Sequence, residues 1–478
     1  MLQGRFFYLS NMKKTPSRRD FLKKAATTAL TAAAIPAIAG STATKKVITL
    51  DQPRRDEKTY GANDQVNVAV IGMGIMGFSN AETTVQIPGV KVVAACDLYT
   101  GRLDRAKEVY GKDIFTTKNY QEVLDRKDID AVIIATSDHW HDRISIDAMN
   151  KGKHVYCEKP MVHHLDEGAA VIDTQKKTGK VFQVGSQRCS SIITEKARQI
   201  YESGVIGELV LVETRNDRHS ANGAWQYSIP TDAKNNTVDW ERFLGDAPKR
   251  EYDPVRFFRW RNYNDYGTGV AGDLFVHLFT GIHAVTGSHG PVRAFATGGL
   301  RYWKDGRDAP DVMAALFDYP ATDKHPAHTM QMRVNFVDGS EDGELLRLVG
   351  SEGAIILGWN DMTVVRNKLT RNPGFGGWDT FHTFTEAQQK EYEKWYKANY
   401  PNPKPEVIEP NMEFKAPEGY NAHYDHHANF YAGIREGKAI KEDALFGMRA
   451  GGPALLANKS YFEKKVINWD PEKAVVIS

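Results

Sequence analysis

Cysteine is scarce in this chain, and neither sign of charge is in surplus. The three cysteines among 478 residues, Cys96, Cys157 and Cys189, lack the paired spacing of a zinc site or a disulfide framework, so we expect buried free thiols. The 62 basic and 60 acidic residues leave a formal net charge of only +2. Because binding to nucleic acid or to an anionic membrane needs a basic surplus, the composition predicts a small molecule as the partner.

The first 40 residues contain no apolar run long enough to span a bilayer, but they carry an export pattern. The segment Ser17-Arg18-Arg19-Asp20-Phe21-Leu22-Lys23 precedes a small-residue apolar run over 25–39, and Ala37-Ile38-Ala39 offers a cleavage site. The pattern predicts a twin-arginine signal peptide over 1–40, a periplasmic location and no membrane attachment after cleavage. A disordered basic leader is the alternative.

The rest of the chain divides into a linker and two domains. Residues 41–64 lack apolar periodicity and predict a polar linker. From 65 to 187, short apolar runs alternate with amphipathic stretches, which predicts βαβ units and a parallel sheet. The expected strands are 66–71, 90–96, 131–135, 154–157 and 181–184.

Beyond residue 187 the pattern changes. A helix is expected over 194–203, and apolar/polar alternation then predicts strands over 208–215, 292–297, 312–317, 330–336 and 344–350. Residues 360–418 suggest a surface excursion, and helices are expected over 423–436 and 446–464. The predicted fold class is α/β, with an N-terminal Rossmann domain and a C-terminal α/β domain, 188–478, that has a largely antiparallel open sheet.

A glycine-rich turn follows the first predicted strand. Gly72-Met73-Gly74-Ile75-Met76-Gly77 has the G-x-G-x-x-G spacing, which allows a tight turn, close approach of the backbone to a pyrophosphate, and close packing of helix on strand. Asp97 ends the second predicted strand, 20 residues after Gly77, where an acid would bind ribose hydroxyls. This favours NAD over NADP, although Arg102 could accommodate a 2′-phosphate. Alternatively, Asp97 only caps the next helix.

Three further segments share their pattern with a known family. Glu158-Lys159-Pro160 follows a predicted strand, residues 135–141 read Ala-Thr-Ser-Asp-His-Trp-His, and residues 272–277 read Gly-Asp-Leu-Phe-Val-His. Together with the glycine-rich turn, they resemble the Gfo/Idh/MocA oxidoreductases, which include glucose-fructose oxidoreductase and inositol dehydrogenase. The resemblance runs from about residue 65 to the C-terminus, weakens over 360–418, and points to an exported, twin-arginine subgroup.

The resemblance implies a catalytic set. Lys159 matches the family's E-K-P lysine, and Asp273 and His277 match its D-x-x-x-H pair, which lines the pocket opposite the nicotinamide. His277, with an ordinary histidine pKa of about 6.5, can accept a hydroxyl proton at neutral pH. Asp273 can lie on the same helix face as His277, and Lys159 can stabilise the developing alkoxide. Taken alone, Lys159 would be a solvated lysine and His277 a core histidine.

Further side chains are candidates by their position after predicted strands. The expected cofactor contacts also include Thr136, His139, His141, Glu158 and Gln187. A sugar platform is expected from aromatic and basic side chains, namely Arg188, Trp225, Tyr227, Arg259, Trp260, Arg261 and Tyr263, although ordinary packing is the alternative. No metal is expected at His423, His426 and His427, because no third ligand is evident at helical spacing.

The sequence thus predicts an NAD-dependent oxidoreductase that oxidises a sugar or glycoside hydroxyl or reduces the keto-sugar. The resemblance implies tightly bound NAD, reaction at glycoside C3, and a dimer or tetramer formed through the open sheet. One alternative is a glycosidase that uses transient C3 oxidation and elimination, although the glycine- and histidine-rich motif of the related α-N-acetylgalactosaminidases is not seen. A second alternative is a non-catalytic sugar-binding protein.

Overall fold

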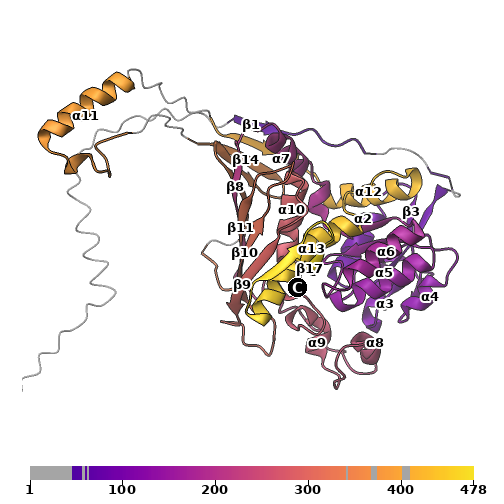
Figure 1. The fold of residues 1–478 in the computed structure, drawn as a ribbon. Coiled ribbons are helices and arrows are strands. Elements are labelled where there is room, and N and C mark those ends of the chain that lie inside the picture. Colours follow the sequence, from indigo (N-terminus) through magenta and orange to yellow (C-terminus); the bar gives the residue numbers. More distant parts are fainter. Residues whose placement is uncertain are drawn as a thin grey trace, which may run out of the picture. The chain divides into compact units, whose positions relative to one another are not determined.

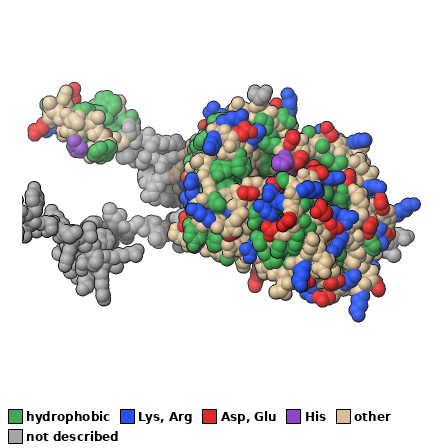
Figure 2. All heavy atoms as spheres, turned by 90° about the horizontal axis from the view of Figure 1, so that it is seen from below, with side chains coloured by type: hydrophobic (Ala, Val, Ile, Leu, Met, Phe, Trp, Pro, Cys, Tyr) green, Lys and Arg blue, Asp and Glu red, His purple; other side chains and the backbone are tan. Residues whose placement is uncertain are grey.

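The computed structural model describes residues 46–55, 60–61, 64–340, 343–367, 374–400 and 410–477 (Figure 1). The predicted signal peptide, 1–40, and the first part of the predicted linker lie outside these ranges. Within them, no helix combines the length and the apolar character that crossing a membrane requires. On the face shown in Figure 2, basic and acidic side chains are intermixed, as the nearly balanced charge leads one to expect.

A parallel sheet of six strands occupies residues 66–185, and its order is β4-β3-β2-β5-β6-β7. The strands are β2 (Val66–Ile71), β3 (Val90–Cys96), β4 (Phe115–Thr117), β5 (Ala131–Ile134), β6 (His154–Glu158) and β7 (Phe182–Gly185). The connecting helices are α2 (Ile75–Thr84), α3 (Thr100–Tyr110), α4 (Tyr120–Leu124), α5 (His141–Asn150) and α6 (Gly168–Thr178). All four residues of β5 are buried, because helices cover both faces of such a sheet.

This strand order reverses between β2 and β5, from which the chain winds outward in both directions. Ligands of open parallel sheets bind at such a reversal, outside the carboxyl ends of the strands. The arrangement confirms the predicted Rossmann fold, and it places the glycine-rich turn at the expected ligand crevice.

An eleven-stranded sheet forms the second layer, in the order β1-β15-β14-β13-β12-β8-β11-β10-β9-β16-β17. Its strands are β1 (Lys46–Thr49), β8 (Leu209–Asp217), β9 (Arg293–Gly299), β10 (Val312–Tyr319), β11 (His328–Asn335), β12 (Gly343–Gly350), β13 (Gly353–Leu357), β14 (Asp361–Arg366), β15 (Met412–Lys415), β16 (Ile467–Asp470) and β17 (Val475–Ile477). The pairs β1–β15 and β8–β11 run parallel and the other pairs antiparallel, which confirms the predicted open, largely antiparallel sheet.

Helices cover one face of this sheet. Strand β10 alternates between the faces, so that Phe317 is buried while Leu316 is 52% exposed. The ring of Phe279 on α10 (Val276–Thr286) packs against Phe317, with ring centroids 5.0 Å apart. Helix α13 (Ala444–Glu463) contacts both β9 and the Rossmann strand β7, and Figure 1 shows it beside α10. The two sheets are therefore joined through a shared helical layer.

Three predictions of chain organisation are wrong in part. Residues 46–49 of the predicted linker form β1, because they pair along their whole length with β15. The predicted excursion over 360–418 contributes β14 and β15 to the sheet and contains α11 (Glu386–Asn399). Helix α12 (Ala422–Glu436), expected in the second domain, packs on η4 (Gln187–Ser190) and also on α2 and β7, so that it buries aromatic side chains in the Rossmann core.

Candidate active site

A cavity of about 440 Å³ opens at the carboxyl ends of the Rossmann strands and is closed by helices and loops of the second domain. Gly72 follows β2 with φ +92°, and a Cβ there would lie 2.5 Å from the Ala135 carbonyl oxygen. A Cβ on Gly77 would lie 1.9 Å from the Gly72 carbonyl oxygen. Both positions therefore need glycine, the first for its backbone conformation and both for space.

The start of α2 supplies a cradle suited to a diphosphate. Gly74 is the N-cap and has no side-chain capping bond, and Gly74, Ile75 and Met76 line the cavity. A Cβ on Gly74 would meet nothing closer than the Arg102 guanidinium at 3.9 Å, so a ligand can approach this backbone. Unsatisfied N–H groups at a helix start attract phosphate oxygens, and the residues present therefore suit a dinucleotide. Met73 and Gly77, expected as direct contacts, lie outside the cavity lining and shape the turn.

Asp97 holds the turn and faces the same cavity. Its carboxylate accepts hydrogen bonds from the backbone N–H groups of Met73, at 2.7 Å, and Tyr99, at 2.9 Å. Arg102 lies 3.4 Å from the same carboxylate, with its guanidinium 5.3 Å from the Phe258 ring. Asp97 is thus a buried acid beside the cradle, where ribose hydroxyls could reach it.

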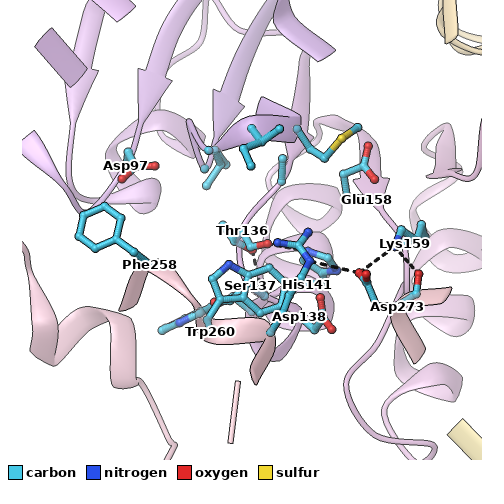
Figure 3. Close-up of a pocket in the computed structure, with 18 of the residues that line it drawn as sticks. Asp97, Thr136, Ser137, Asp138, His141, Glu158, Lys159, Phe258, Trp260 and Asp273 are labelled. Atoms are coloured by element: carbon cyan, nitrogen blue, oxygen red, sulfur yellow. Dashed lines mark hydrogen bonds and ion pairs between the residues drawn. The ribbon is translucent and has the colours of Figure 1, made fainter. Parts of the chain in front are cut away.

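A compact ion cluster lies at the other side of the close-up (Figure 3). The Lys159 ammonium, directly after β6, donates to the carbonyl oxygen of Asp273 at 2.7 Å and to its carboxylate at 2.9 Å. The Arg261 guanidinium donates to the same carboxylate oxygen at 3.2 Å. Burial alone would raise the pKa of Asp273, but the charges of Lys159 and Arg261 outweigh burial and hold that pKa well below its ordinary value.

The Asp273–His277 spacing does not form an ordinary α-helical turn. Asp273 lies in a π-helical segment, η6 (Ala271–Phe275), which runs directly into α10, where His277 sits in its first turn. A π-turn carries an extra residue and commonly marks a functional site. The prediction that both residues line the cavity agrees with their positions, but the prediction of a regular i, i+4 pair on one α-helix is wrong.

His277 lines the cavity, and one of its ring nitrogens has no hydrogen-bond partner among the described residues. Its Nδ1 is buried and has no hydrogen-bond partner among the described residues, and its ring lies 5.9 Å from that of Trp359. Burial first, and the Lys159 charge next, hold the pKa of His277 well below its ordinary value. The expectation of an unperturbed pKa at this histidine is therefore wrong, and the imidazole is neutral at neutral pH.

Glu158 is the group that titrates near neutrality. It ends β6, is only 5% exposed, and accepts a hydrogen bond from the Asn80 side chain at 2.8 Å. Burial raises its pKa from 4.5 to about 7, although Asn80 and Lys159 oppose the rise. The cavity thus contains a neutral imidazole, a cationic lysine and an acid that changes charge around pH 7.

The loop after β5 places its histidines differently. His141 lines the cavity and its Nδ1 lies 2.7 Å from the Pro160 carbonyl oxygen, which ties this loop to the loop after Lys159. His139 faces the other way, with Nε2 at 2.9 Å from the Phe243 carbonyl oxygen and Nδ1 at 3.3 Å from that of Tyr266. Two carbonyl groups thus hold the His139 ring outside the cavity lining, and its expected cofactor contact stays a prediction. Thr136 and Gln187 line the cavity as expected.

Only some members of the expected sugar platform line the cavity. Trp225, Tyr227, Trp260 and Arg261 line the cavity. The other three expected members lie outside its lining: Arg188 pairs with Glu344 and stacks 4.1 Å from Trp359, Arg259 donates to the Tyr227 carbonyl oxygen at 2.8 Å, and Tyr263 lies 4.1 Å beneath Arg256. Arg188 and Arg259 therefore act behind the wall, through residues that line it.

The histidines of α12 serve packing. The Nε2 of His426 lies 2.7 Å from the Val184 carbonyl oxygen, and His427 stacks on Tyr156 with ring centroids 4.4 Å apart. His423 lines the cavity. In the part of the chain that is described, no three His, Cys, Asp or Glu side chains are placed to share a metal ion.

Several lining residues escaped sequence reasoning. They are Lys118, Tyr120, Asp138, Trp140, Arg218, Arg242 and Trp359. Asp138 and Trp140 belong to the loop after β5, which already held other candidate residues. Their position in this loop could have identified them. Arg218 directly follows the last residue of β8, so the end of a predicted strand was the signal there. Trp359 lies between β13 and β14, directly before the stretch expected to be a surface excursion.

Known proteins resemble the two parts of the chain to different degrees. The family model for Gfo/Idh/MocA proteins, described as an oxidoreductase family with an NAD-binding Rossmann fold, matches residues 66–186. A glycosyl hydrolase family 109 protein of Shewanella baltica is 36% identical over 214 residues, covering 40% of this chain and 44% of that protein. An inositol 2-dehydrogenase of Salmonella typhimurium is 29% identical over 167 residues, covering 34% and 49%. The chain spans about half the length of the curated relatives it matches.

Solved structures share the whole architecture at low identity. Levoglucosan dehydrogenase in complex with NADH has a TM-score of 0.59 at 16% identity, covering 84% of this chain and 99% of that one. An oxidoreductase from Thermotoga maritima has a TM-score of 0.59 at 14% identity, covering 86% and 100%. These two likenesses show the fold, and the family match is confined to the first domain. Residues 66–186 are thus similar to the NAD-binding Rossmann domain of the Gfo/Idh/MocA oxidoreductases.

Proposed function

We propose that this protein is an NAD-dependent oxidoreductase that oxidises a hydroxyl group of a sugar or glycoside, or reduces the corresponding ketone. The observation that carries the proposal is that one cavity holds both the glycine cradle and the Lys159–Asp273–His277 cluster. The aromatic side chains of Trp225, Tyr227 and Trp260 in the same wall suit the apolar faces of a sugar ring. Relatives and structural neighbours named as inositol and levoglucosan dehydrogenases support a polyol or sugar substrate.

Residues of the chain would accept and return the proton of the substrate hydroxyl. Oxidation of a secondary alcohol removes a hydride from carbon and a proton from oxygen, and bound NAD would accept the hydride. His277, a neutral imidazole that lines the cavity, would accept the hydroxyl proton. Lys159 would donate a hydrogen bond to the developing alkoxide, and Asp273 would keep the ammonium oriented. In the reductive direction His277 would return the proton.

We further propose that NAD stays bound between turnovers and that the reacting position is C3 of a glycoside. A periplasmic enzyme has no free nicotinamide pool to exchange with, so a second sugar-like substrate would reset the cofactor. The C3 assignment is supported by the resemblance to exported enzymes that act at this carbon.

A second candidate function is favoured by the 36%-identical relative named as a glycosyl hydrolase. In that reaction, transient oxidation at C3 acidifies the neighbouring C2–H, elimination then breaks the glycosidic bond, and water addition and reduction complete hydrolysis. Both candidates use the same cavity and the same proton acceptor. They differ in the product, because the hydrolase releases a free sugar with no net change in redox state.

A panel of glycosides tests the two candidates. The purified protein, after denaturation and mass spectrometry, should release NAD in near-stoichiometric amount, and incubation with the panel should yield a keto-sugar. Release of the aglycone together with an unoxidised sugar would favour the hydrolase instead. NAD-loaded protein that converts no member of the panel to either product would contradict the proposed function.

We propose export through the twin-arginine route, supported by Arg18 and Arg19 before the apolar run 25–39. Replacing both arginines with lysine should retain the protein in the cytoplasm, as measured by cell fractionation. Replacing Lys13 and Lys14 with arginine is the matched control and should leave export unchanged. A double-lysine variant that still reaches the periplasm would contradict this route.

A further inference from the structure

We propose that the sugar bound at this site carries a carboxylate, and that Arg218 is the residue that recognises it. The inference deepens the proposed function, on which it rests, by naming the class of sugar. It comes from the pairing of the charged groups near His277, in which Arg218 stands apart from Lys159, Arg261 and Arg188.

Arg218 belongs to the part of the cavity wall that the second domain forms. It follows Asp217, the last residue of β8, and its side chain lines the cavity. Its guanidinium lies 5.5 Å from the Phe336 ring, and Trp225 packs on that same ring with centroids 5.0 Å apart. Arg218 and Trp225 therefore both pack on the Phe336 ring, and both line the cavity in which a sugar ring would stack.

The other cations near His277 already have carboxylate partners. Lys159 and Arg261 share the carboxylate of Asp273. Arg188 forms an ion pair with Glu344. Three of the four cations near His277 thus form ion pairs, with the carboxylates of Asp273 and Glu344.

Of these four cations, Arg218 is the one that forms no ion pair with a described carboxylate. Its guanidinium donates to the neutral side-chain oxygen of Asn216, at 3.0 and 3.2 Å. In the described ranges, no carboxylate oxygen lies within 4.0 Å of it. The adjacent Asp217 does not serve, because its fully buried carboxylate accepts from Arg333 at 2.5 Å. A planar guanidinium with free donors in a partly closed cavity matches a carboxylate, which can accept two parallel hydrogen bonds.

The diphosphate of a dinucleotide does not account for this cation. The cradle at Gly74 and the acid at Asp97 belong to the ends of β2 and β3, and Figure 3 places Asp97 and Asp273 on opposite sides of the cavity. The charge of Arg218 instead acts on His277 and Tyr227. At His277 it adds to burial, which lowers the pKa, and at Tyr227 it opposes burial, which raises the pKa. A carboxylate bound at Arg218 would offset this effect and make His277 a stronger proton acceptor.

Matched pairs of sugars test the inference. We would titrate the NAD-loaded protein with methyl glycosides of glucose, galactose and mannose and with the corresponding methyl glycuronides, using calorimetry so that binding is measured without turnover. For the stereoisomer that binds best, the glycuronide should bind about tenfold to a hundredfold more tightly than the neutral glycoside, as charge-assisted hydrogen bonds allow. Added salt should narrow this difference.

Variants of Arg218 test whether this residue causes the preference for the glycuronide. Arg218→Gln should bring the two affinities of the pair within about threefold of each other, and Arg218→Lys should keep part of the preference, because the charge remains without the planar fork. Arg105→Gln is the matched control, since that arginine is exposed on α3 and pairs with Glu108. It should leave the preference unchanged.

The outcomes separate this inference from the proposed function. A neutral glycoside that binds as tightly as its glycuronide overturns the acidic-sugar assignment and leaves the proposed function standing. A preference that survives in Arg218→Gln overturns the role of Arg218. If NAD-loaded protein binds no member of either series and oxidises none, the proposed function and this inference both fail.

Discussion

Replacing Glu158 with glutamine should remove an ionisation near pH 7 from the folded protein. Glu158 is 5% exposed, and its buried carboxyl has a pKa of about 7 instead of 4.5. Because the pKa is raised on folding, the native state binds a proton that the unfolded chain releases. The associated stability is fully present below about pH 4.5 and is lost as the pH rises through about 7.

The size of the effect follows from the two pKa values. Their difference corresponds to about 3 kcal/mol of unfolding free energy once the pH is well above 7. Between pH 5 and pH 8 the wild type should therefore lose about 2 to 3 kcal/mol relative to Glu158→Gln, whose side chain does not titrate. The amide can still accept the hydrogen bond from Asn80, so the packing is kept.

Urea unfolding at the two pH values measures this difference. Glu108→Gln is the matched control, because Glu108 is exposed on α3 and should show the wild-type pH dependence. Turnover adds a second readout: the ionisation near pH 7 should disappear from the pH profile of Glu158→Gln and remain in that of His277→Ala. Equal pH dependence of stability in wild type and Glu158→Gln would refute the assignment of this ionisation to Glu158.

Three further substitutions test the site. Gly77→Ala should abolish NAD retention, measured by mass spectrometry, because its Cβ would meet the Gly72 carbonyl oxygen at 1.9 Å; retained NAD would contradict the cradle. Asp97→Ala should weaken NAD binding more than NADP binding in fluorescence titrations, and equal losses would leave Asp97 only as support for Met73. Lys159→Ala should lower turnover by about a hundredfold or more with NAD still bound, and near-normal turnover would exclude alkoxide stabilisation.

The fold could be predicted largely because its signals are local. The apolar runs over 66–71 and 131–135 are strand-length and separated by helical stretches, which is enough to indicate a parallel sheet. The elements that were predicted wrongly depend on contacts with residues far away in the sequence. Strand β1 is defined by pairing with β15 more than 360 residues away, and α12 reads as an ordinary amphipathic helix until its contacts with the Rossmann core are known.

The sequence predicted the site where a motif determines the chemistry. It was less informative where the surrounding residues determine the pKa or the orientation of a side chain. The glycine turn and the cluster of Lys159, Asp273 and His277 meet in one cavity, as the family resemblance implied. Spacing could not reveal the π-turn at Asp273, nor the low pKa of His277, because desolvation and neighbouring charge set that value. It also could not reveal that two carbonyl groups turn His139 away.

Transfer of hydrogen from a sugar carbon to the nicotinamide is the central claim, and isotope labelling tests it directly. NAD-loaded protein would be mixed in a single turnover with a glycoside deuterated at every ring carbon, and the cofactor would then be released and weighed by mass spectrometry. The account predicts reduced cofactor that carries one deuterium. Conversion of the glycoside with no deuterium in the cofactor at any time would contradict it.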